Sequence, residues 1–238
     1  MIIHDLRILV SASLTAAALA LPAAAQDAAP APAPATQGAD ATATATATAT
    51  ETAEPQILPD LFLGAEDAPI TIYEYASYTC PHCATFHREV FPLLKAEYID
   101  TGKVRFALRD VYFDQVGLWA GIVARCNDEK FYPVSGMLMN EQSDWMGASD
   151  GTELVANLRK IAAKAGMTSE QVDVCWSDEA RVESLVATFQ HNATTDGINA
   201  TPSFMIAGEQ VSNQPWEQLK AKIDEKLAEA GAGTPAAQ

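Results

Sequence analysis

Two cysteines separated by two residues have the clearest chemical capacity in this sequence. They lie in Cys80-Pro81-His82-Cys83, where a β-branched and aromatic stretch gives way to helical spacing. A cysteine in the first turn of a helix lies beside unpaired backbone N–H groups and the positive end of the helix dipole, which favour the thiolate. Pro81 suits this turn because proline has no N–H to leave unpaired. The position therefore indicates a reactive thiol at Cys80.

The surroundings of Cys80 favour an oxidising disulfide. The His82 side chain between the cysteines can supply a hydrogen-bond donor or a partial positive charge, which would lower the pKa of Cys80 further. Since a stabilised thiolate is a good leaving group, a Cys80–Cys83 disulfide is expected to be reactive and easily reduced. Cys83, one turn into the helix, is expected to be more buried and to resolve or re-form the bond.

Three other uses of the cysteine pair fit these residues less well. A zinc site needs four ligands, and beyond this pair only His82 and His87 lie close in the sequence, so no metal is expected. Covalent haem attachment needs a histidine directly after the second cysteine, where Ala84 stands. A purely structural disulfide remains an alternative, although so short a loop restricts the unfolded chain little. No cofactor is expected.

The N-terminal part of the chain is expected to be an export signal followed by a spacer. Residues 1–25 have a weakly basic start, an apolar run and the small-residue site Ala23-Ala24-Ala25, which predict a cleaved signal peptide. The alternative is an uncleaved anchor, but the apolar run of about fourteen residues is shorter than the roughly twenty that span a bilayer. Residues 26–56 are rich in Ala, Pro and Thr and predict a disordered spacer, and residues 231–238 predict a disordered tail.

The charge of the chain limits its partners. The formal net charge is −16. A surface this acidic argues against nucleic acid and against anionic membranes as partners. Because the charges are scattered through helices, they are interpreted as promoting solubility.

The foldable part predicts an α/β unit interrupted by helices. Residues 70–75 and 104–108 have strand patterns, and the helical spacing from Phe86 to Tyr98 between them predicts a parallel crossover. A strand at 203–206, a turn at 207–209 and a final helix from Pro215 complete the unit. Helical patterns between the two parts occupy residues 118–126, 128–139, 154–165, 169–176 and 179–195.

Several of these stretches resemble one family. The run from Glu74 to Cys83, the strand residues 102–106 with Arg109-Asp110, and the loop 199–204 are similar to those of DsbA-type periplasmic thiol:disulfide oxidoreductases. The resemblance implies a thioredoxin-like fold with an inserted α-helical domain: residues 57–113 and 189–230 form the thioredoxin-like domain and 114–188 the insertion. One stretch departs from the pattern, since Val111-Tyr112-Phe113 stands where many relatives have a proline, which leaves client preference open.

The resemblance also implies roles for Thr201 and Pro202. Pro202 corresponds to a cis-proline that packs against the disulfide and shapes a groove for an extended substrate. The backbone groups of Thr201 would pair with that substrate as an added strand does. The alternative is an ordinary trans proline at the start of a strand.

Glu74 has two interpretations. Relatives keep a buried acid beneath the active site, which implies that Glu74 exchanges a proton with Cys83. The alternative is a strand-edge carboxylate paired with Arg105 or Arg109.

Cys126 and Cys175 remain as a second pair. In an exported chain, which reaches an oxidising compartment, four cysteines can form two disulfides. The spacing pairs Cys80 with Cys83, which leaves Cys126 and Cys175 for the other disulfide. A structural disulfide is expected, as in some relatives, and two buried free thiols are the alternative.

The resemblance implies a periplasmic dithiol oxidase that acts, as a monomer, on reduced or unfolded exported client proteins. A quinone-linked membrane protein of the DsbB type would reoxidise it. An isomerase or reductase with the same site is the alternative, followed by a redox-inert or metal-carrying thioredoxin-like binding module.

Overall fold

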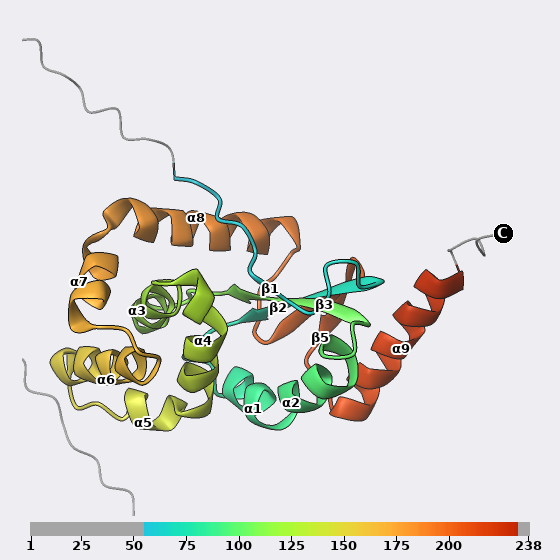
Figure 1. Cartoon of the computed structure of the whole chain (residues 1–238), viewed down its shortest axis with the longest axis horizontal. Helices are drawn as coiled ribbons and strands as arrows, with labels where there is room; N and C mark the ends of the chain where they lie inside the picture. The colour runs from blue at the N-terminus through green and yellow to red at the C-terminus, as the bar shows by residue number, and fades with distance from the viewer. Residues whose placement is uncertain (1–54, 233–238) are drawn as a thin grey trace, which may run out of the picture. The chain divides into compact units, whose positions relative to one another are not determined.

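The computed structural model describes residues 55–232 of the chain (Figure 1). The predicted signal peptide, the predicted spacer up to residue 54 and the tail from residue 233 lie outside the described residues. Within the described part of the chain, no helix has the length and apolar character that crossing a bilayer requires.

A five-stranded sheet forms the centre of the described chain, in the order β1-β3-β2-β4-β5. Strands β2 (Ile70–Ala76) and β3 (Val104–Asp110) run parallel, in register from Ile70 opposite Val104 to Ala76 opposite Asp110. Strand β4 (Ser203–Ile206) pairs antiparallel with β2, and β5 (Glu209–Ser212) pairs antiparallel with β4. The predicted parallel crossover is confirmed, whereas β1 (Phe62–Leu63), antiparallel to β3, was too short to predict.

The strands present alternate residues to two layers of helices. On β2, the Glu74 side chain points to α1 (Pro81–Glu89), while the adjacent Tyr75 points to α8 (Glu179–Thr195). Successive side chains of a strand point to opposite faces, so a single strand serves both layers. Helix α1 therefore lies on one face of the sheet and α8 on the other (Figure 1).

The predicted helix after Cys80 is divided into three pieces. Helix α1 (Pro81–Glu89) is followed by α2 (Phe91–Leu94) and by a π-helical turn, η1 (Lys95–Ile99). Pro92 explains the first interruption, because its ring nitrogen cannot donate a hydrogen bond to the preceding turn. The apolar spacing of the sequence runs through all three pieces, which is why it indicated one helix.

A block of helices follows β3 and lies at one end of the sheet (Figure 1). Asp114 caps the first helix by accepting a hydrogen bond from the Gly117 N–H, so this helix begins three residues earlier than predicted, at Gln115. Helix α5 was not predicted, because it is too short to show a helical period. The block consists of α3 (Gln115–Ala124), η2 (Asp128–Lys130), α4 (Phe131–Asn140), α5 (Gln142–Met146), α6 (Gly151–Lys164) and α7 (Ser169–Ser177).

Helix α8 (Glu179–Thr195) connects this block to the sheet. It contacts α7 near its start and β3 further along, so the predicted domain boundary at residue 188 falls inside one continuous helix. The segment before β1 lies along α8: the N–H of Gln56 donates to Ser184 Oγ (3.1 Å) and that of Leu58 to Thr188 Oγ1 (2.8 Å).

The last helix, α9 (Trp216–Ala232), packs beside η1 and covers the same side of the sheet as α1. A single apolar core runs from the sheet into the helical block and includes Phe106 and Ile206 as well as Leu138 and Leu158. The predicted fold class, an α/β thioredoxin-like fold with an inserted helical domain, is confirmed.

Candidate active site

Cys80 and Cys83 lie where β2 passes into α1. Cys80 is the N-cap residue, with an extended backbone (φ −80°, ψ 118°), and Pro81 takes the first helical position. The Cys80 N–H donates to the Ser77 carbonyl (3.1 Å), which fixes the turn between strand and helix. Both cysteines are free thiols in this structure; Cys80 is partly exposed and Cys83 is fully buried. A dissolved thiol can therefore reach Cys80 but not Cys83.

The pKa values of the two thiols are shifted in opposite directions. The hydrogen bond from the Cys83 thiol, with help from the Thr201 side chain and from the backbone N–H groups of Cys83 and His82, lowers the pKa of Cys80 to about 5, although burial opposes this. The same hydrogen bond, burial and the charge of Glu74 raise the pKa of Cys83 far above its ordinary value. Near neutral pH, the outer sulfur is a thiolate and the inner one a thiol. The His82 side chain is exposed, and His82 acts on Cys80 through its backbone N–H.

Thr201 lies directly against Cys80, and Pro202 follows it in the chain. The peptide bond between them is cis, in agreement with the sequence-based expectation. The Cys80 Sγ lies 3.4 Å from the carbonyl oxygen of Thr201, although the two residues are 121 positions apart in the sequence. Pro202 is buried and Thr201 is partly exposed. The loop before β4 therefore forms one wall of the site.

Glu74 lies beneath the site, fully buried on β2. Its carboxylate oxygens lie 3.0 and 3.1 Å from Nε2 of His87, one helical turn after Cys83. The alternative pairing with arginine is wrong: Arg109 binds Asp60 and Asp196, and the guanidinium of Arg105 lies over the Phe62 ring. His87 was not assigned a role from the sequence, where only its four-residue spacing from Cys83 could have indicated one.

The helical block holds the turn that carries Cys80. The amide of Gln142, at the start of α5, donates to the carbonyl oxygens of Tyr78 (2.7 Å) and Cys80 (3.0 Å). The Thr79 hydroxyl donates to the carboxylate of Asp114, the cap of α3 (2.6 Å). These contacts were missed by sequence reasoning, because Gln142 and Asp114 carry no local signal that relates them to a cysteine far away in the chain.

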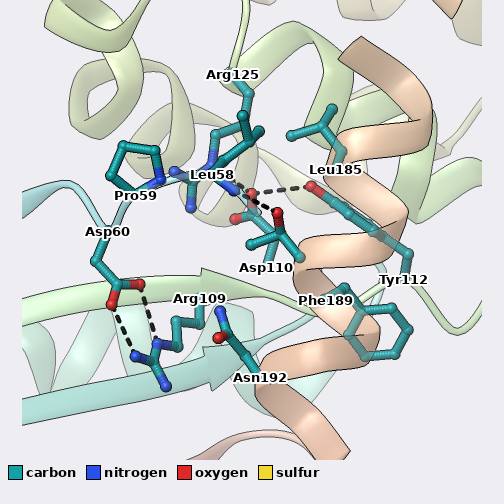
Figure 2. Close-up of a pocket in the computed structure, with 11 residues that line it drawn as sticks. Leu58, Pro59, Asp60, Arg109, Asp110, Tyr112, Arg125, Leu185, Phe189 and Asn192 are labelled. Atoms are coloured by element: carbon teal, nitrogen blue, oxygen red, sulfur yellow. Dashed lines mark hydrogen bonds and ion pairs between the residues drawn. The ribbon is translucent and has the colours of Figure 1, made fainter. Parts of the chain in front are cut away.

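A buried polar cluster lies behind this turn, around Asp110 at the end of β3 (Figure 2). The hydroxyls of Tyr78 (2.9 Å) and Tyr112 (3.0 Å) donate to its carboxylate, and so does Nε of Arg125 (2.7 Å). The buried charge of Asp110 is thereby paired and hydrogen-bonded, as burial requires. The unusual Tyr112 thus completes this cluster, and its ring fits because Gly121 has no side chain: a Cβ there would lie 2.3 Å from the ring.

The pocket shown in Figure 2 lies between the segment before β1, the end of β3 and α8. Its charged lining residues are already paired, Asp60 with Arg109 and Asp110 with Arg125. Cys80 and Cys83 are not among its lining residues. The pocket therefore belongs to the packing between α8 and the sheet and not to the cysteine site.

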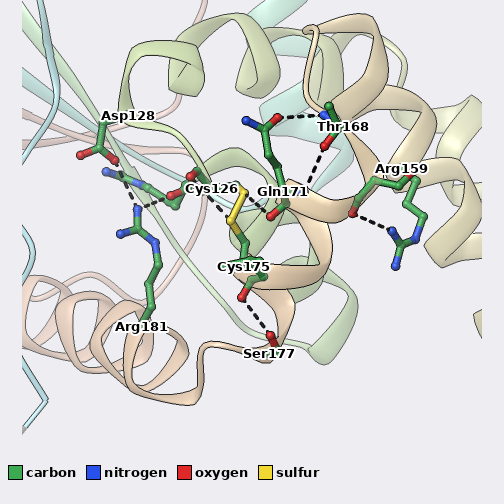
Figure 3. The surroundings of a disulfide bond; sticks show 11 residues. Cys126, Asp128, Arg159, Thr168, Gln171, Cys175, Ser177 and Arg181 are labelled. Carbon is green, nitrogen blue, oxygen red and sulfur yellow. Dashed lines mark hydrogen bonds and ion pairs between the residues drawn. A yellow bond between two sulfur atoms is a disulfide. The ribbon is translucent and has the colours of Figure 1, made fainter.

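Cys126 and Cys175 form a disulfide that links the end of α3 to α7 (Figure 3). Their Cα atoms are 5.5 Å apart, and 49 positions separate them in the sequence. The bond ties together two helices of the inserted block. Among the described residues, no group of three or more His, Cys, Asp or Glu side chains could hold a metal ion.

The fold and the site define a class: a thioredoxin-fold protein of the DsbA type, with a dithiol at the start of its first helix and a helical block inserted after β3. A family model described as thioredoxin matches residues 57–225. The chain belongs to the thioredoxin family.

Known relatives agree with this class. A putative protein-disulfide oxidoreductase of Rickettsia bellii is 32% identical over 173 residues, which cover 72% of this chain and 66% of the relative. Disulfide bond formation protein D of Bacillus subtilis is 24% identical over 182 residues, covering 74% of this chain and 81% of that protein. The chain spans less than two thirds of the length of the Rickettsia relatives, for example 61% of the one from Rickettsia felis.

Solved structures give the same result. The crystal structure of α-DsbA1 from Wolbachia pipientis superposes with a TM-score of 0.66 at 29% identity, covering 74% of this chain and 94% of that one. A protein-disulfide isomerase from Novosphingobium aromaticivorans superposes with a TM-score of 0.62 at 25% identity, covering 71% and 99%. The predicted resemblance to DsbA-type proteins is confirmed.

Proposed function

We propose that this chain is a thiol-disulfide oxidoreductase that works as a dithiol oxidase and introduces disulfides into client proteins through Cys80 and Cys83. The observation that carries the proposal is the contrast between the two thiols: a reachable Cys80 whose pKa is lowered to about 5 and a buried Cys83. A dithiol in which one thiolate is this stable gives up its disulfide readily, because the reduced form is favoured. The names of the Rickettsia and Bacillus relatives support the same activity.

The reaction begins with the oxidised Cys80–Cys83 pair. A client thiolate attacks the Cys80 sulfur, and the electron pair of the broken bond stays on Cys83, which takes up a proton. A second client thiolate then attacks the client sulfur of this mixed disulfide. Cys80 leaves as a stable thiolate, the client has lost two electrons, and the protein is reduced. The low pKa of Cys80 drives the second displacement.

The wall formed by Thr201 and Pro202 supports a way to hold the client. Thr201 is partly exposed beside Cys80, so its backbone groups could pair with an extended client segment as an added strand does. We propose that such clients are exported proteins, that the chain acts as a monomer in the periplasm, and that a quinone-linked membrane protein of the DsbB type restores the disulfide. The sequence pattern of residues 1–25 and the family resemblance support this setting.

Isomerisation or reduction by the same site is the second candidate. The Novosphingobium relative carries the name protein-disulfide isomerase. Such enzymes work from the dithiol form, in which the Cys80 thiolate attacks a client disulfide. The two candidates therefore differ in the redox potential of the Cys80–Cys83 pair, which decides which form predominates.

The deciding experiment is the equilibrium of the Cys80–Cys83 pair with a glutathione redox buffer, in a Cys126→Ala/Cys175→Ala variant that contains no other thiols. A potential at or above about −180 mV, that of protein disulfide isomerase, is expected for an oxidase. A potential near about −270 mV, that of thioredoxin, would overturn the oxidase proposal and indicate a reductant. Failure of Cys80 to exchange at all would instead indicate a redox-inert binding module.

A further inference from the structure

One residue of β2 contacts the chain on both sides of the loop that carries Thr201. After the loop, Ser203 of β4 lies opposite Tyr75 in the sheet. Before the loop, the Tyr75 hydroxyl donates to the carboxylate of Asp196, the C-cap residue of α8, over 2.5 Å. The loop between Asp196 and Ser203 is therefore fixed at both ends to the strand that leads to Cys80.

Arg109 of β3 holds the same two side chains from the next strand. It lies opposite Tyr75 in the parallel pair of β2 and β3. Its Nη1 donates to the Tyr75 hydroxyl (2.6 Å) and to the carboxylate of Asp196 (2.9 Å). Its Nε and Nη2 donate to the carboxylate of Asp60, in the segment before β1 (Figure 2), over 3.0 and 2.7 Å. Because a guanidinium presents several donors in one plane, Arg109 joins parts of the chain that are far apart in the sequence.

The loop clamp, by which we mean Tyr75, Arg109 and Asp196, is largely shielded from water. The side chain of Arg109 is 15% exposed and that of Asp196 is 19% exposed, and Tyr75 has no exposed surface. Burial and the hydrogen bond to Asp196 raise the pKa of Tyr75, so its hydroxyl keeps its proton and remains a donor. An ion pair with so little contact with water is screened less by salt than a surface pair, and breaking it leaves a charge without compensation. The start of the loop is therefore held more firmly than an exposed ion pair would hold it.

The loop clamp lies behind the cysteine site and not within it. Its tyrosine meets α8, on the face of the sheet opposite α1 (Figure 1). Cys80 follows Tyr75 by five residues, and Thr201 follows Asp196 by five residues. These two short segments bring the Cys80 sulfur to within 3.4 Å of the Thr201 carbonyl oxygen. A shift of Asp196 relative to Tyr75 would therefore move the backbone groups that the loop presents beside the sulfur.

We propose that the loop clamp positions the backbone of Thr201 beside Cys80 so that it can pair with an extended client segment. The proposal rests on the function proposed above and adds three positioning residues, Tyr75, Arg109 and Asp196. A loop that is already fixed loses little conformational freedom when a client binds, whereas a loosened loop has to be ordered by the client. Loss of the clamp should therefore weaken the oxidation of a client peptide. It should leave exchange with a small thiol nearly unchanged, because a small thiol reaches Cys80 without pairing with the loop.

Asp60 provides a matched control for Asp196. The Asp60 carboxylate accepts two hydrogen bonds from Arg109. The Asp196 carboxylate also accepts two, from Arg109 and Tyr75. The two aspartate side chains are 18% and 19% exposed. Asp60→Asn and Asp196→Asn thus each remove one negative charge beside the same arginine, but only Asp196 leads into the loop.

The test compares these two variants with the wild type in two reactions. The oxidised protein reacts either with an excess of a reduced, unstructured peptide that contains two cysteines or with reduced glutathione. Reduction of the Cys80–Cys83 bond is followed by mass spectrometry of the alkylated protein, and the peptide rate constant is divided by the glutathione rate constant. In Asp196→Asn this ratio should fall at least about fivefold, the factor that corresponds to one typical hydrogen bond. In Asp60→Asn it should stay close to the wild-type value.

Three results would contradict the proposal. Equal ratios in Asp196→Asn and Asp60→Asn would overturn it, since the loss would then not depend on the loop. A fall of both rate constants in Asp196→Asn by the same factor would also overturn it, because the clamp would then support Cys80 itself and not the pairing with a client. If neither the peptide nor glutathione reduces the wild-type protein, thiol exchange is absent, and the proposed function fails together with this inference.

A further variant covers the case in which Asp196→Asn does not fold. Tyr75→Phe removes only the hydroxyl and keeps the buried ring, the pairing of β2 and the ion pairs of Arg109. The ratio of the two rate constants should fall at least about twofold, the lower end for the loss of one hydrogen bond. The fall should be modest, because Arg109 still holds Asp196. An unchanged ratio in Tyr75→Phe would rule out the clamp.

Discussion

The two cysteine pairs of this chain contain the same atoms in different surroundings. Cys80 and Cys83 lie at the start of one helix, beside its unpaired N–H groups and a cis-proline loop. Cys126 and Cys175 lie 49 positions apart and join two helices of the inserted block. The first pair encloses too few residues to restrain the unfolded chain, and the second lacks a helix start that would stabilise a thiolate. The position of a cysteine in the fold, more than its ability to pair, therefore separates exchange chemistry from stabilisation.

The largest difference between the pairs should be seen in catalysis, by replacing Cys80 of the first pair or both cysteines of the second. Cys80→Ser is expected to reduce the oxidation of a reduced client peptide to the uncatalysed rate, because the only sulfur of that pair that a client can reach is gone. Cys126→Ser/Cys175→Ser should retain catalysis. Both rates are measured with the same peptide and limiting oxidised glutathione. Loss of activity in the second variant but not in the first would reverse the assignment of the two pairs.

A second difference concerns pH. Ultraviolet thiolate absorbance of the reduced protein should titrate with a midpoint near pH 5, the pKa of Cys80. Because this pKa is lower in the folded state, the reduced form should have an additional stability above the ordinary thiol pKa of about 8.5 that is lost as the pH falls through about 5. The oxidised form lacks this dependence, since a disulfide does not titrate. Chemical denaturation of both forms across this range measures it, and parallel pH dependences would be the contrary result.

The Cys126–Cys175 bond should mainly affect stability. Replacing both cysteines with Ala releases a loop of 49 residues in the unfolded chain and should lower the free energy of unfolding by about 2–4 kcal/mol. Urea denaturation of the oxidised proteins measures the change. Reducing the Cys80–Cys83 bond in the wild type is the matched comparison. If that reduction destabilised the protein as much as the double replacement does, the contrast between the pairs would be lost.

The smallest expected effect sharpens the comparison by asking how much the helical block assists Cys80. Gln142→Ala removes the hydrogen bonds to the carbonyls of Tyr78 and Cys80 and should loosen the N-cap of α1. The pKa of Cys80 should rise by less than about one unit, since a hydrogen bond contributes about 0.5–1.5 kcal/mol and these two bonds hold the backbone of the turn and do not reach the Cys80 sulfur. Gln171→Ala, in the capping box of α7, is the control and should leave the thiolate titration unchanged. An equal shift in both variants would indicate a general loosening of the fold.

The local part of the site could be predicted from the sequence. Cys80, Pro81 and Cys83 are neighbours, and the chemistry of a cysteine at a helix start follows from the backbone of the same few residues. The strands on either side were also predicted, because their β-branched and aromatic residues give a clear pattern. The Thr201–Pro202 loop was found only through family resemblance, since nothing local relates it to Cys80.

The remaining contacts depend on tertiary packing. The sequence left two interpretations of Glu74 open, proton exchange with Cys83 or pairing with an arginine. Spacing along the chain does not tell which helix covers that face of β2. The structure pairs it with His87, and it places Gln142 and Asp110 behind the cysteine turn. Each of these contacts joins the sheet to a helix packed on it or to the inserted block. A pattern of apolar residues predicts that such elements pack, but not which polar side chains meet between them.

The sheet order has a consequence for how such a protein avoids aggregation. Its outer strands, β1 and β5, comprise two and four residues, so each offers little open backbone for another chain to extend. Glu209 on β5 also forms ion pairs with Lys222 and Lys226 of α9, which place charges along that edge. Short and charged edges are the features by which β-proteins resist the addition of foreign strands. The clients proposed above would therefore pair with the loop before β4 and not with these edges.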